Sequence, residues 1–190
     1  MVLKRLAVMF IPLFVSVAAF AAPPVSGRAD TPEKAAKMSE TFSVLHAVSQ
    51  WASTLSDMAD KRAKSDLVKD YARTMATTNA NADAKLRAIA DKNGLTIAPL
   101  DTQTEEGKSL IDRMKAETAL LGSLQGDAFD KEYMTLVTNT QQSVIHFLQT
   151  NEAMAKDPEV KQFLAEMSTT VQNRLKTAQD VMAKIYGNSI

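Results

Sequence analysis

Apolar residues recur every three or four positions in four long segments of the chain, the spacing that places them on one face of an α-helix. The segments cover about residues 32–62, 65–93, 127–155 and 158–187. The second segment is interrupted by Thr78 and Asn79, and the third by Thr140 and Gln141. No stretch alternates strongly enough between apolar and polar residues to predict a strand. The pattern therefore predicts an all-α protein with four long helices.

Capping signals set the limits of these helices. Pro32 and Pro158 stand at the first helical position, where a proline fits because its missing N–H would have no helical acceptor. Gly94 follows the second segment, where left-handed backbone commonly ends a helix. The connections inside the first and second pairs of helices are only a few residues long, which predicts antiparallel neighbours. The N-cap residues that we expect are Thr31, Ser65, Asp127 and Asp157.

The connection between the second and third long helices is longer and contains a helix of its own. It begins with a loop that includes a proline. Thr102 and Glu105 have the spacing of a capping box for a short helix, and Gly122 and Gly126 flank the next break. Such a helix would act as a crossover that lets the second hairpin pack beside the first. We therefore expect a ferritin-like four-helix bundle with a short crossover helix.

The first residues have the pattern of an export signal. Lys4 and Arg5 precede an apolar stretch over residues 6–20, and Ala21 completes a small-x-small cleavage pattern. We predict a signal peptide (1–21), a flexible leader (22–31) and a bundle domain (32–187), with a periplasmic location after cleavage. The alternative is an uncleaved segment that anchors the protein in the inner membrane, although the stretch is short for a span and Pro12 interrupts it.

Composition excludes several classes of function. The chain has 22 Lys and Arg against 22 Asp and Glu, and none of the basic residues form a stripe, so we expect no nucleic-acid binding. Zero cysteines exclude disulfides, thiolate metal sites and cysteine nucleophiles. After signal cleavage we expect no stable membrane span. An unidentified protein partner remains compatible with the sequence.

The sequence lacks the motif of a di-metal bundle. Such a site needs a carboxylate and an imidazole one turn apart on a stripe that faces the core, and no Glu-x-x-His occurs in the chain. The two histidines, His46 and His146, have no acid three or four positions before them. We therefore predict no catalytic residue, no metal ligand and no cofactor.

Several runs in the second, third and fourth long segments resemble a known family of exported bacterial proteins. They are VKDYARTM at residues 68–75, LRAIADKNGL at 86–95, FDKEYM at 129–134 and DPEVK at 157–161. Together they resemble the family called domain of unknown function 4142, over roughly residues 39–182. The resemblance implies a ferritin-like fold, and the activity of the family is not established.

The resemblance also implies where a metal site would stand. Members of the family usually carry acid–histidine pairs at the places of Thr78-Asn79 and Thr140-Gln141, a glutamate at Ala52 and a histidine at Arg174. Asn and Gln are poor ligands for iron, manganese or zinc. We therefore expect these positions to form a hydrogen-bonded polar layer in the core, to which Thr170 adds a hydroxyl. The alternative is that several of them face solvent.

Two functional hypotheses follow. The first is an exported, non-enzymatic helical-bundle protein of the bacterial cell envelope, whose surface serves interaction or envelope stress. The second is a ferritin-like metal-binding or redox protein with an atypical site. The residues that such a site would have to recruit are His46, His146, Asp57, Glu152 and Glu166.

Overall fold

The computed structural model describes residues 32–187, and all regular secondary structure in this part of the chain is helical. No strand occurs within it, which confirms the predicted all-α class. The predicted signal peptide (1–21) and leader (22–31) lie outside the described residues. The five helices are α1 (Pro32–Arg62), α2 (Asp66–Lys92), α3 (Glu105–Ser123), α4 (Gly126–Met154) and α5 (Pro158–Tyr186).

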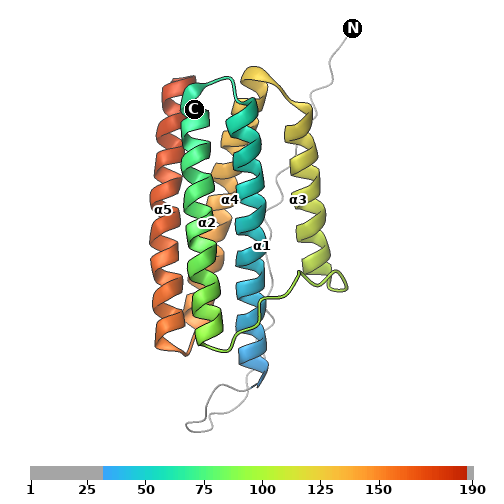
Figure 1. Cartoon of the computed structure of the whole chain (residues 1–190), viewed down its shortest axis with the longest axis vertical. Coiled ribbons are helices and arrows are strands. Elements are labelled where there is room, and N and C mark those ends of the chain that lie inside the picture. The colour runs from blue at the N-terminus through green and yellow to red at the C-terminus, as the bar shows by residue number, and fades with distance from the viewer. Residues whose placement is uncertain (1–31, 188–190) are drawn as a thin grey trace.

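The four long helices pack side by side as two hairpins (Figure 1). α1 packs on α2 and α4 packs on α5, each pair joined by a short turn, as the sequence predicts. The hairpins then meet through α2 with α5 and α1 with α4. α3 lies on the outside, along α1 in Figure 1, and contacts α4.

The core divides into two clusters of apolar side chains, one toward each end of the long helices. Tyr71, Phe129 and Tyr133 belong to the first cluster, and Phe42 and Phe163 to the second. The sequence interruptions on α2 and α4 fall between the two clusters. The polar residues therefore occupy a middle level of the core, where all four long helices meet.

Helix ends show which capping predictions were correct. Asp157 caps α5 by accepting hydrogen bonds from the N–H groups of Glu159 (2.9 Å) and Val160 (3.0 Å), as predicted. Gly94 has the left-handed φ of +64° expected after α2. The Asp127 prediction was wrong, because α4 begins at Gly126 with Gln125 at the N-cap.

Two further caps differ from the sequence prediction. Ser65 stands at the N-cap of α2, but its side chain makes no capping bond. The buried carboxylate of Asp130 on α4 instead accepts the N–H groups of Lys64 (3.0 Å) and Ser65 (2.7 Å). The cap of α3 is Thr104, which accepts the N–H of Gly107, and not Thr102. A Cβ at residue 107 would lie 2.0 Å from the Asp101 carbonyl oxygen, so glycine is required there. Gly122 in the last turn of α3 and Gly126 at the start of α4 flank the break between these helices, as the sequence predicts.

Polar side chains tie the long connection to α1. The hydroxyls of Ser39 and Ser43 each accept one backbone N–H of the loop, from Thr96 and Ala98, at 3.0 Å. Trp51 of α1 donates its indole N–H to Thr118 of α3 at 2.9 Å. Arg62 donates to the carbonyls of residues 122 and 124 at the end of α3.

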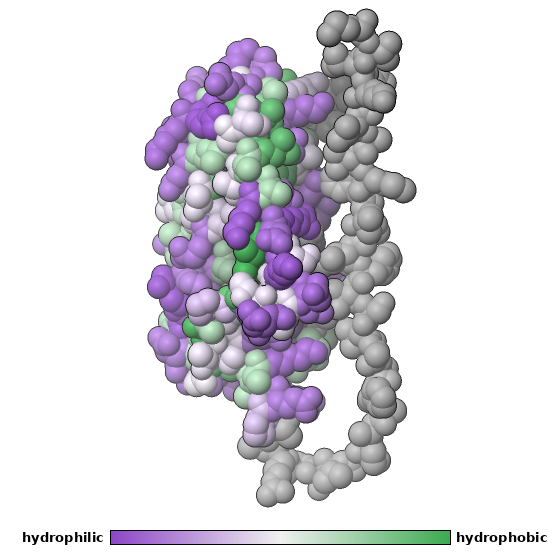
Figure 2. Space-filling model, turned by 90° about the vertical axis from the view of Figure 1, so that its right-hand side faces the viewer, coloured by the Kyte–Doolittle hydropathy of each residue, from purple (hydrophilic) through white to green (hydrophobic). Residues whose placement is uncertain are grey.

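The surface on the α3 side is mainly hydrophilic (Figure 2). Hydrophobic residues appear there in narrow patches between polar and charged side chains. Across residues 32–187, the large apolar side chains that are strongly exposed are Leu67, Leu120 and Met154, each on a different helix. None of the five helices has a stretch long and apolar enough to cross a membrane.

Candidate functional site

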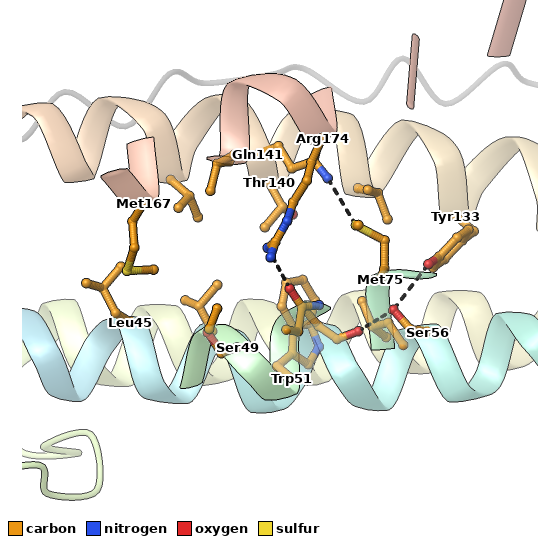
Figure 3. Close-up of a pocket in the computed structure, with 18 residues that line it drawn as sticks. Leu45, Ser49, Trp51, Ser56, Met75, Tyr133, Thr140, Gln141, Met167 and Arg174 are labelled. Atoms are coloured by element: carbon orange, nitrogen blue, oxygen red, sulfur yellow. Dashed lines mark hydrogen bonds between the residues drawn. The ribbon is translucent and has the colours of Figure 1, made fainter. Parts of the chain in front are cut away.

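A cavity of about 70 Å³ lies at the middle level of the core. We call it the central cavity. Leu45, Ala52 and Val137 are among its apolar walls, and Met75 and Met167 add thioethers. All four long helices contribute residues to it (Figure 3). Of the six positions that the family resemblance singled out along the chain, all but Thr78 line this cavity, namely Ala52, Asn79, Thr140, Gln141 and Arg174.

Among the described residues, Arg174 of α5 is the only one with a charged side chain that lines the central cavity. Its Nη1 donates to Asn79 Oδ1 at 3.0 Å, and its Nη2 donates to the Thr78 carbonyl oxygen at 3.0 Å. Asn79 is 8% exposed, and Arg174 is partly buried. These two bonds join α5 to α2 across the interface between the hairpins.

Gln141 of α4 makes the second hydrogen-bonded contact of this level. It is 8% exposed, and its Nε2 donates to the Tyr71 hydroxyl of α2 at 2.7 Å. The same nitrogen lies 3.8 Å from the Met75 sulfur (Figure 3). Among the described residues, neither Gln141 Oε1 nor Arg174 Nε has a hydrogen-bond partner, although both atoms are buried. We use the name polar layer for Asn79, Gln141 and Arg174.

Burial changes the acid–base properties of this layer. It raises the pKa of Tyr71 to about 12, although the bond from Gln141 and the charge of Arg174 act in the opposite direction. Burial lowers the pKa of Arg174. Because a guanidinium starts from a very high pKa, Arg174 is still cationic at neutral pH. The neutral phenol of Tyr71 therefore lies beside a layer that carries a fixed positive charge.

The threonines that the sequence predicted in the layer are less buried than Asn79 and Gln141. Thr78 is partly exposed, and its hydroxyl donates to the Thr74 carbonyl of its own helix. Thr140 is partly exposed and lines the central cavity. Thr170 is exposed and bonds the Glu166 carbonyl. Asn79 and Gln141 are thus buried, whereas the threonine side chains lie at the edge of the layer.

The residues considered for an atypical metal site are not brought together. Asp57 and His146 are exposed, and Glu166 accepts a hydrogen bond from Lys85 at 2.7 Å. Within residues 32–187, no three His, Asp or Glu side chains are arranged to hold a metal ion. The polar layer itself offers amides and a cation where such an ion would need anionic or imidazole ligands.

A second polar cluster, centred on Asp83, was not predicted. Asp83 is 2% exposed, and its Oδ1 lies 2.6 Å from His46 Nδ1. Its Oδ2 accepts from Gln50 Nε2 at 3.1 Å and pairs with Arg87 Nη2 at 2.9 Å. The sequence feature that could have predicted its inward position is spacing, because Asp83 follows Asn79 by one helical turn along the inward face of α2.

Comparison with known protein families shows which family the chain belongs to. The model of a family described as a domain of unknown function (DUF4142) matches residues 23–181. The chain belongs to the DUF4142 family. This confirms the resemblance seen in the sequence runs of α2, α4 and α5. Among curated proteins, none matches the chain in sequence.

A solved structure supports the helical fold of this DUF4142 chain. It is the crystal structure of a DUF305 protein from Streptomyces coelicolor that is described as secreted. The two structures align with a TM-score of 0.60 at 19% sequence identity, over 80% of this chain and 93% of that one. At this identity the similarity concerns the fold alone.

Proposed function

We propose that the protein is an exported, non-enzymatic helical bundle of the bacterial cell envelope, located in the periplasm. In this proposal the four long helices form a ferritin-like bundle and α3 is its crossover helix. The apolar stretch at residues 6–20 and the secreted description of the DUF305 protein support export. The surface of the bundle then serves an interaction in the envelope, with the polar layer holding the hairpins in register.

The position of Arg174 carries the non-enzymatic part of the proposal. Its guanidinium lines the cavity where a di-metal bundle would place carboxylates and imidazoles. At an effective dielectric constant of 20, a divalent cation about 4 Å from this charge would be repelled by about 8 kcal/mol. Asn79 and Gln141 supply no negative charge to offset that repulsion. The cavity is therefore built to exclude the metal ion on which ferritin-like chemistry depends.

One observation favours the alternative of an atypical metal or redox site. Asp83 holds His46 by Nδ1, and a carboxylate in that position is the usual support of a metal-binding histidine. The other ring nitrogen of the partly exposed His46 could then bind a metal. Such a site would need further ligands from beyond residues 32–187 or from a partner.

Activity measurements on the mature protein test the proposal. We expect the purified chain to neither decompose hydrogen peroxide nor accelerate the oxidation of iron(II) by oxygen, with or without added iron or manganese. The variant His46→Ala serves as the matched control for the alternative site. Turnover that His46→Ala abolishes would establish the alternative, and turnover that survives it would contradict both.

Mass spectrometry of the N-terminus tests the location. We expect the protein recovered from cells to begin at Ala22 and to appear in the periplasmic fraction. A chain that retains residues 1–21 and sediments with the inner membrane would contradict periplasmic release and establish the anchored form.

A further inference from the structure

A groove of about 460 Å³ lies between α2 and α5 on the outside of the polar layer. We call it the α2–α5 groove. Tyr71, Thr74 and Thr78 line one side, and Asn173, Arg174 and Thr177 line the other. Its size falls within the range of small-molecule sites in proteins. Arg174 and Met75 line both the groove and the central cavity, so they stand between the two.

The positive charge of Arg174 has no counter-charge in the described structure. None of the ion pairs formed within residues 32–187 includes it. Its hydrogen-bond acceptors, Asn79 Oδ1 and the Thr78 carbonyl, are neutral. Asp70, the one acid that lines the groove in the described part of the chain, is already paired with Arg73. Since partly buried charges are normally paired, the groove carries an unmatched positive charge that favours an anion.

Hydrogen bonding confines that anion to one end of the groove. The hydroxyls of Thr74, Thr78, Thr170 and Thr177 each donate to the carbonyl one turn earlier in their own helix. Their protons are therefore not available to an anionic group. A guanidinium has five N–H donors, and Asn79 and Thr78 take two of those on Arg174. The remaining Nη protons and the side-chain amide of Asn173, which lies beside Arg174 in the groove, are donors that an anion can use.

The rest of the groove suits an apolar body. Leu67, which is 41% exposed, and Val181 line it together with the threonines. We propose that the α2–α5 groove binds a small organic anion, with its carboxylate on the Arg174 guanidinium and its apolar part against Leu67 and Val181. This site is separate from the question of a metal in the central cavity, so its failure would leave the proposed function standing.

Nuclear magnetic resonance titration of the mature protein with benzoate and hexanoate tests this site. We expect saturable shifts of the backbone amides of Thr74, Thr78, Asn173 and Thr177, with a Kd of about 1 mM or tighter for at least one carboxylate. Benzamide has the same shape without the charge, and sulfate has charge without the apolar body. Both should bind at least tenfold more weakly than the better carboxylate.

Three variants test whether any observed binding takes place in the α2–α5 groove. Arg174→Gln removes the charge and should weaken binding at least tenfold. Thr74→Phe fills the groove while leaving Arg174 in place, and should have the same effect even if Arg174→Gln fails to fold. Lys176→Gln is the matched control, since it removes an exposed positive charge from the same helix and should leave binding unchanged.

Several results would overturn the proposal. One is the absence of saturable shifts with both carboxylates up to about 10 mM. Another is equal binding of sulfate, which would exclude recognition by the apolar residues. Unchanged binding in Thr74→Phe, or equal losses in Arg174→Gln and Lys176→Gln, would place the anion elsewhere on the surface.

Discussion

At the residue scale, Arg174 brings a positive charge to the level of the core where the four long helices meet. Two neutral oxygens on α2 hold it, the side-chain oxygen of Asn79 and the backbone carbonyl of Thr78. A hydrogen bond with one charged partner contributes about 1.5–3 kcal/mol, and a buried charge that loses its partner costs more than a neutral group does. The stability of the layer should therefore depend on both members being present.

A double-mutant cycle on Asn79 and Arg174 tests this dependence. Asn79→Leu should lower the free energy of unfolding by about 2 kcal/mol, because Nη1 of Arg174 loses its acceptor. Adding Arg174→Leu should recover most of that loss, since both polar groups are then gone. Urea denaturation followed by circular dichroism measures the three variants. Strictly additive losses would show that the two residues do not stabilise one another.

The raised pKa of Tyr71, beside the polar layer, makes the stability of the protein depend on pH in the alkaline range. Its folded-state pKa of about 12 lies above the value near 10 of an unfolded tyrosine. Burial also raises the pKa values of Tyr133 and Tyr186. Raised values favour the neutral phenols, so this contribution to stability is complete below about pH 10 and is lost as pH rises toward 12.

Ultraviolet titration of the three tyrosines checks that behaviour. At pH 10 we expect less phenolate absorbance from the folded protein than from the urea-unfolded chain, which is about half ionised there. The urea midpoint should fall progressively above pH 10. Phenolate absorbance that matches the unfolded chain while circular dichroism still reports a folded protein would contradict the burial of Tyr71 and Tyr133.

At the scale of helices, Asp130 fastens the turn between α1 and α2 to α4. It is 1% exposed, and both of its carboxylate oxygens accept backbone N–H groups, from Lys64 and Ser65. It thereby supplies the anionic cap that the side chain of Ser65 does not provide, at a helix N-terminus that favours negative charge. One residue thus caps α2 and docks one hairpin on the other.

Asp130→Ala should lower the free energy of unfolding by about 3 kcal/mol, because two buried N–H groups lose their acceptor. Asp127→Ala is the matched control, since that nearby carboxylate is exposed and pairs only with the side chain of Lys64. We expect Asp127→Ala to change the free energy of unfolding very little. Comparable losses in the two variants, measured by urea denaturation, would contradict the role given to Asp130.

The sequence predicted the structural features that depend on residues close together in the chain. Apolar spacing located the helices, and Asp157 before Pro158 located the start of α5 to the residue. It did not predict that Asp130 caps α2, because the two partners lie 65 residues apart and meet only after the hairpins pack. The cap of α3 at Thr104 was missed because Thr102 and Thr104 each precede a possible first residue of the helix.

The candidate site was predicted in position but not in its bonds. Interrupted apolar stripes, and the family resemblance, singled out Asn79, Gln141 and Arg174, which line one cavity. The contacts of Arg174 with Asn79 and of Gln141 with Tyr71 depend on how each helix is rotated about its axis. Apolar periodicity gives that rotation only to within a broad face. The pairing of His46 with Asp83 was missed for the same reason.

At the scale of the whole molecule, the polar layer separates two apolar clusters and lies where the two hairpins meet. The helices pack most extensively within each hairpin, so contacts between hairpins decide their relative position. A polar contact that forms in only one register can specify that position even where it adds little stability. In this account the middle of the bundle serves assembly of the fold, in the place where other bundles hold metal.

Metal content is the measurement that tests this account most directly. Natively exported Ala22–Ile190, purified without a histidine tag, should contain far less than one equivalent of iron, manganese, zinc or copper. A variant that combines Ala52→Glu, Thr78→Asp, Asn79→His, Thr140→Asp, Gln141→His and Arg174→His should bind at least one equivalent, because five of these positions line the central cavity and Thr78 is next to Asn79 in the chain. Near-stoichiometric metal in the unmodified protein, retained in His46→Ala, would contradict the central claim that Arg174, Asn79 and Gln141 stand in place of a metal centre.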